Sequence, residues 1–134
     1  MTVVIDGGAG VTFPDTIQQS NALTITGGAP RYYAARAWAN VDGFGGATIR
    51  AQANVASVSY LGTGRYRITF ATAMPDANYA AVVTAGTTST SQMYLDAHVY
   101  GTPTATSFTV MVTFQSGGSP TYSDPDYLNV VVFR

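Results

Sequence analysis

Residues 107–114, with the sequence SFTVMVTF, decide the fold class of this chain. The apolar side chains of this stretch occupy every second position: Phe108, Val110, Val112 and Phe114. Mainly hydroxyl residues stand between them, and such alternation turns one face of a β-strand toward a core and the other toward solvent. Residues 65–70, RYRITF, repeat the pattern. Both stretches therefore predict half-buried strands.

Five further stretches have the composition of strands and are separated by glycine-rich turns: 34–41, 53–60, 79–85, 92–100 and 127–134. The last of them is apolar on both faces, which predicts a central strand or a strand at a subunit interface. Closely spaced glycines and prolines leave no room for a helix. The sequence thus predicts an all-β fold, an antiparallel two-sheet sandwich that is jelly-roll-like.

The charge composition narrows the classes of partner. The 134 residues contain six arginines and seven aspartates but no lysine, glutamate or cysteine, and the net charge is -1. A net charge this small creates no electrostatic field that would attract nucleic acid. No stretch of the sequence approaches the ~20 consecutive apolar residues of a membrane span. So few charges also leave a small protein poorly protected against association. We therefore expect partner subunits to cover part of the surface, and we expect no nucleic-acid binding and no membrane insertion.

Residues 1–30 differ from residues 31–134, because short apolar groups are interrupted there by Gly-Gly and Pro-containing clusters. A flexible leader would explain this composition. However, Val11, Phe13, Leu23 and Ile25 are too apolar for a free tail. We therefore favour an extended N-terminal arm that pairs with neighbouring chains or with a larger assembly, followed by the sandwich domain.

Two stretches resemble segments of bacteriophage tail-fibre proteins. Residues 10–20, GVTFPDTIQQS, are similar to the G-V-x-F-P-D-G-T-x-Q segment that often precedes the end domain of such fibres. Residues 35–79 begin ARAWANVDG and end AMPDANY, and they resemble the longer A-R-A-W … A-M-P-D-A-N-Y run of many phage tail and particle proteins. The resemblance covers roughly residues 10 to 80.

This resemblance implies a β-rich component of the virion surface that forms a homotrimer, with no metal and no cofactor. The function we expect is that of a tail-fibre or adhesin-type structural protein, located at the tail fibre or tail tip, that attaches to a host-surface saccharide. Its arm would then bind other virion proteins. The alternative is a capsid decoration or head-fibre protein without receptor binding.

One candidate receptor-binding surface lies in residues 92–100. Tyr94, Asp96, His98 and Tyr100 share one face of the predicted strand, because they stand at alternate positions. They form either a solvated or interface face or a saccharide-binding surface, since tyrosine offers a stacking plane and aspartate and histidine offer hydrogen bonds. One histidine and one aspartate are too few ligands for a metal ion.

The second candidate is the loop predicted for residues 117–127. It contains Tyr122, Asp124, Asp126 and Tyr127 around an Asp-Pro-Asp sequence. Asp-Pro favours a turn, so a purely structural role is one interpretation. The other is a recognition loop, because binding residues concentrate in the loops of sandwich folds.

Trp38, the only tryptophan, stands between alanines, which favours an anchor in the core or at an interface over a platform for a sugar.

The sequence contains no Gly-x-Ser-x-Gly, His-Glu-x-x-His or phosphate-loop motif. We therefore expect no enzymatic activity.

Overall fold

The computed structural model describes residues 4–6, 10–12, 18–19, 34–90, 94–116 and 118–134. The chain divides into two compact units, Met1–Arg31 and Tyr32–Arg134. In the first unit, three short antiparallel strands pair in chain order: β1 (Val4–Asp6), β2 (Gly10–Thr12) and β3 (Gln18–Gln19). Val11 of the predicted arm lies in β2, opposite Ile5 and Gln19. Phe13, Leu23 and Ile25 lie outside the described residues.

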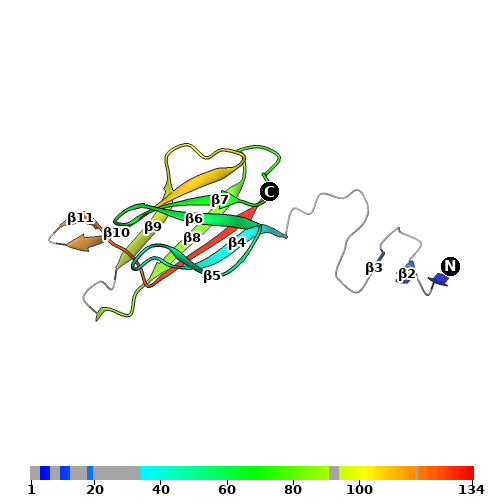
Figure 1. Ribbon diagram of the computed structural model, residues 1–134, viewed down its shortest axis with the longest axis horizontal. Coiled ribbons are helices and arrows are strands. Elements are labelled where there is room, and N and C mark those ends of the chain that lie inside the picture. The colour runs from blue at the N-terminus through cyan, green and yellow to red at the C-terminus, as the bar shows by residue number, and fades with distance from the viewer. Residues whose placement is uncertain (1–3, 7–9, 13–17, 20–33, 91–93, 117) are drawn as a thin grey trace. The chain divides into compact units, whose positions relative to one another are not determined.

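The second unit is a sandwich of two antiparallel sheets (Figure 1). The first sheet has the order β5-β4-β12-β8, with β5 at Thr48–Ala53, β4 at Ala35–Asp42, β12 at Tyr127–Phe133 and β8 at Ala80–Gly86. The second sheet has the order β11-β10-β7-β6, and β9 also pairs with β10. Its strands are β11 (Ser119–Tyr122), β10 (Ser107–Ser116), β7 (Arg65–Phe70), β6 (Val55–Gly62) and β9 (Leu95–Tyr100). The predicted all-β, two-sheet sandwich is confirmed.

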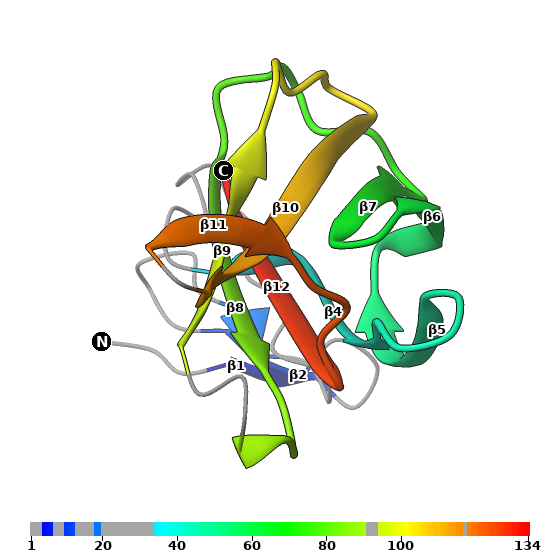
Figure 2. The ribbon, with the colours of Figure 1, turned by 90° about the vertical axis from the view of Figure 1, so that its left-hand side faces the viewer.

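The chain passes repeatedly between the two sheets (Figure 2). It crosses after β5, β7, β8 and β11, and it returns last to the first sheet. There β12 pairs with β4 on one side and with β8 on the other. The strand that is apolar on both faces is therefore central, as its sequence predicts.

The core forms where the alternating apolar residues of the two sheets meet. From the second sheet it takes Tyr66, Ile68, Phe70, Phe108, Val110 and Val112, and from the first sheet Ala37, Ala39, Val41, Leu128, Val130 and Val132. All of these are at most 5% exposed. Each larger side chain contributes about 1.5–3 kcal/mol by its burial.

The strand predicted for residues 53–60 is wrong at its start. Asn54 has a φ of 55°, in the left-handed region that asparagine tolerates, and it separates β5 from β6. Its side-chain amide donates to the carbonyl oxygens of Arg36 and Thr72, and its Oδ1 accepts from the backbone N–H of Thr72. The bend lets the chain leave the first sheet and enter the second.

Trp38 does not lie in the core, so that part of the prediction is wrong. Ala37, Ala39 and Val41 face the core, and strand alternation therefore turns Trp38 outward, where it is 39% exposed. Its cross-strand neighbours on this outer face are Val131 of β12 and Ala53 of β5.

Candidate functional site

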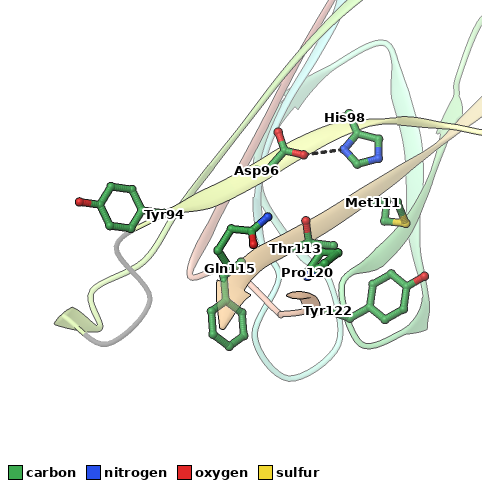
Figure 3. Close-up of a pocket in the computed structure, with 9 residues that line it drawn as sticks. Tyr94, Asp96, His98, Met111, Thr113, Gln115, Pro120 and Tyr122 are labelled. Atoms are coloured by element: carbon green, nitrogen blue, oxygen red, sulfur yellow. Dashed lines mark hydrogen bonds and ion pairs between the residues drawn. The ribbon is translucent and has the colours of Figure 1, made fainter. Parts of the chain in front are cut away.

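An open groove of about 400 Å³ lies on the outer face of the second sheet (Figure 3). Nine residues from three neighbouring segments line it: Tyr94, Asp96, His98, Met111, Thr113, Phe114, Gln115, Pro120 and Tyr122. Four of these, Tyr94, Asp96, His98 and Tyr122, belong to the residues predicted to bind a receptor. The structure thus brings together residues of both candidate regions, although His98 and Tyr122 are 24 residues apart in the sequence.

The register of β10 explains this convergence. Thr113 pairs with Asp96 of β9 on one side and with Tyr122 of β11 on the other. Side chains of directly opposed residues point to the same face of a sheet, so these three form one row across the groove. Met111 continues the face, since it pairs with His98 of β9 and Arg65 of β7.

Two tyrosines and a polar floor define the chemistry of the groove. Tyr94 and Tyr122 stand at opposite ends in Figure 3, and they are 78% and 49% exposed. Between them lie the hydroxyl of Thr113 and the amide of Gln115. Exposed aromatic faces beside hydrogen-bonding side chains suit a ligand that has both apolar and hydroxyl-bearing faces, as a sugar ring has.

Asp96 and His98 of β9 contact each other within the groove. Oδ2 of Asp96 lies 3.0 Å from Nδ1 of His98, and both side chains are largely exposed. Beside the groove, the guanidinium of Arg65 lies 5.7 Å from the ring centroid of Tyr122, within cation–π range. Tyr100 lies farther along β9 and is 53% exposed, but it is not part of the groove lining.

Asp124 has a structural role, because its carboxylate accepts hydrogen bonds from three residues of the sandwich. Its Oδ1 accepts hydrogen bonds from the hydroxyl of Tyr66 at 2.6 Å and from the backbone N–H of Gly64 at 2.7 Å. Its Oδ2 accepts from the hydroxyl of Tyr60 at 3.0 Å. Burial of Tyr66, together with the nearby carboxylate of Asp124, raises the pKa of the Tyr66 hydroxyl, so this hydroxyl stays protonated and donates.

Like Asp124, Asp126 accepts hydrogen bonds from neighbouring residues of the fold. Oδ2 of Asp126 accepts hydrogen bonds from the backbone N–H and the hydroxyl of Thr88 and from the hydroxyl of Thr87. The bond from the Thr88 N–H is the main reason why the pKa of Asp126 is lowered. Tyr127 follows in β12 with its ring 4.8 Å from the guanidinium of Arg50. None of these residues lines the groove.

Sequence reasoning missed the β10 residues Met111, Thr113 and Gln115 as part of the site. It assigned residues 107–114 to the core on the strength of the apolar positions and gave the intervening positions no role. It also treated residues 117–127 as one loop, whereas Ser119–Tyr122 form β11. The signal that could have found the groove is the polar outer face of β10, read together with that of residues 94–100.

Among the residues that the structure describes, no three histidine, cysteine or acidic side chains come together as metal ligands. The same residues contain no helix long and apolar enough to cross a membrane. Comparisons with protein-family models, with curated proteins and with solved structures found no match to this chain.

Proposed function

We propose that this chain is a non-enzymatic structural protein of a bacteriophage virion, of the tail-fibre or adhesin type, that attaches the particle to a host-surface saccharide. The groove between Tyr94 and Tyr122 is the observation that carries the attachment role, because two exposed aromatic rings border hydrogen-bonding side chains there. The viral context rests on the resemblance of residues 10–20 and 35–79 to tail-fibre segments.

The proposed homotrimer is supported by the outer face of the first sheet. A row of uncharged side chains crosses all four strands there: Ala53, Trp38, Val131 and Val82. Trp38 and Val82 are 39% and 54% exposed. The adjacent row of Ala51, Asn40, Asn129 and Thr84 is also uncharged. An exposed apolar row without charges favours burial against further copies of the chain.

Binding to host cells tests this function. Purified protein is expected to bind saturably to the bacterial strain that the phage infects and to lose binding to mutants that lack the surface saccharide. Tyr122→Ala should reduce binding, whereas Phe44→Ala should not. Phe44 is a suitable control because it is 72% exposed in the β4–β5 turn, outside the groove lining. Equal binding to receptor-deficient cells would refute the proposal.

A capsid decoration or head-fibre role is the second candidate function. The uncharged rows on the outer face of the first sheet favour it, because such rows could serve assembly without any receptor. Antibody labelling of whole particles separates the two roles: label at the tail end supports attachment, and label over the head supports decoration. In either role, we propose that residues 1–30 bind other virion proteins. Loss of the protein from particles when this arm is deleted would support that assignment.

A further inference from the structure

We infer that the ligand of the groove is an acidic saccharide and that Arg65 and Arg67 of β7 bind its carboxylate or phosphate groups. This inference rests on the proposed saccharide-binding function and narrows its ligand class.

The first argument comes from how the arginines are paired. Arg50 forms an ion pair with Asp42 at 2.8 Å, and Arg134 forms one with Asp76. Within the described part of the chain, neither Arg65 nor Arg67 has a carboxylate at ion-pair distance. Both are exposed on β7. Two guanidinium groups on one face, neither with a carboxylate partner among the described residues, are therefore available to an external anion.

The second argument is position. Arg65 pairs with Met111 of the groove lining, and Arg67 pairs with Thr109, the next outward-facing residue of β10. Because they are two residues apart on one strand, both arginines point to the outer face, with Cα atoms roughly 7 Å apart. Arg65 also lies beside the Tyr122 ring. A sugar on Tyr122 would thus place its acidic substituents next to two cations.

The carboxylates near this face do not neutralise the arginines by contact. Asp96 is on β9, two strands and roughly 10 Å from β7, which is about one Debye length in physiological salt, and it contacts His98. Asp124 already accepts hydrogen bonds from Tyr60, Gly64 and Tyr66.

Arginine also has the right geometry for such a ligand. The planar guanidinium donates two parallel hydrogen bonds to a carboxylate or phosphate, and these charge-assisted bonds are about twice as strong as neutral ones. Thr113 and Gln115 would bind sugar hydroxyls, and Tyr122 would pack against a ring. The groove thus provides the groups for the acidic and the neutral parts of the ligand.

The test measures the affinity of the wild-type protein for three forms of one polysaccharide: a uronic-acid form, its carboxyl-reduced neutral form and a phosphorylated form. Calorimetry at low and high salt is suitable. The acidic forms are expected to bind roughly tenfold tighter than the neutral form, with affinity falling as salt rises. Preference for the uronic-acid or the phosphorylated form identifies the anionic group.

Variants locate the anion site. Arg65→Gln and Arg67→Gln should each weaken binding of the acidic polysaccharide roughly tenfold and leave the neutral form unaffected. Arg36→Gln is the matched control, since Arg36 is exposed on β4 of the other sheet. Thermal denaturation verifies that each variant is folded.

The outcomes separate the inference from the proposed function. Equal affinity for acidic and neutral forms, or wild-type affinity in both arginine variants, would overturn the acidic-saccharide inference. If binding still depended on Tyr122 in that case, the saccharide-binding function would stand. Failure of the protein to bind host cells at all would instead overturn the proposed function, and the inference with it.

Discussion

Replacement of Asp124 by alanine should destabilise the sandwich by about 3 kcal/mol. Three donors lose their acceptor in this variant, and their environments differ. The backbone N–H of Gly64 is buried and would be left unpaired, at a cost of about 1–3 kcal/mol. The Tyr66 hydroxyl would exchange a charge-assisted bond for a neutral one to the Gly43 carbonyl oxygen, 3.0 Å away, at a cost of about 1 kcal/mol. Tyr60 is 41% exposed, so its hydroxyl can bind water at little cost.

The loss of unfolding free energy can be measured by urea denaturation of four proteins: the wild type, Asp124→Ala, Tyr66→Phe and the double variant. Tyr66→Phe alone should cost about 1.5–3 kcal/mol, because it removes one hydrogen bond to a charged group. The double variant should be less destabilised than the sum of the two single variants by about 1 kcal/mol or more, since each single change already breaks the shared bond.

Saccharide binding by the folded fraction of Asp124→Ala should remain near that of the wild type. Tyr122 keeps its ladder pairing with Thr113, and the backbone N–H of Ser123 donates to the Val112 carbonyl oxygen at 3.2 Å. A loss of less than ~1 kcal/mol in stability, additive variants, or a large loss of binding at unchanged stability would refute the assignment of Asp124 to the fold.

Three further predictions follow from other residues. If the first sheet forms the proposed trimer interface, Val82→Arg should convert the trimer to monomer in sedimentation analysis without lowering subunit stability, because Val82 is exposed in the uncharged row. The N–H of Thr88 lowers the pKa of Asp126, so the stability that this carboxylate contributes is present above about pH 4 and lost as the pH falls through its lowered folded pKa. The melting temperature of Asp126→Asn should therefore decrease less on acidification than that of the wild type. Gly64→Ala should reduce the free energy of unfolding in urea by more than ~2 kcal/mol, because Gly64 has a φ of +67° and its added Cβ would lie 2.3 Å from the Val112 carbonyl oxygen.

The core could be predicted from the sequence because its signal is local. Alternation along residues 65–70 and 107–114 assigns each side chain to one face, and only one face is apolar enough to be buried. Residues 48–53 and 119–122 carry no such signal. All their side chains are exposed or half-buried, so their pairing with β4 and β10 leaves no periodic apolar pattern.

The site could be predicted only in part, because it depends on the register between segments distant in sequence. Tyr94, Asp96 and His98 are recognisable as one face from their spacing alone. Their meeting with Tyr122 depends on β10 pairing with both β9 and β11, which no local pattern specifies. For the same reason, Asp124 and Tyr122 could not be distinguished as candidate binding residues from the sequence, although the carboxylate of Asp124 is turned inward to Tyr66 and the ring of Tyr122 outward to the groove.

The two outer faces of the sandwich differ in a way that fits a multivalent attachment protein. The outward residues of β4, β12 and β8 include an uncharged row with Trp38 at its centre, whereas those of β9, β10 and β7 are polar and include Arg65 and Arg67. Since the faces belong to opposite sheets, self-association through the first face would leave every groove exposed. Three grooves on one trimer would then bind a repetitive polysaccharide together, and even weak single-site affinity would become firm attachment.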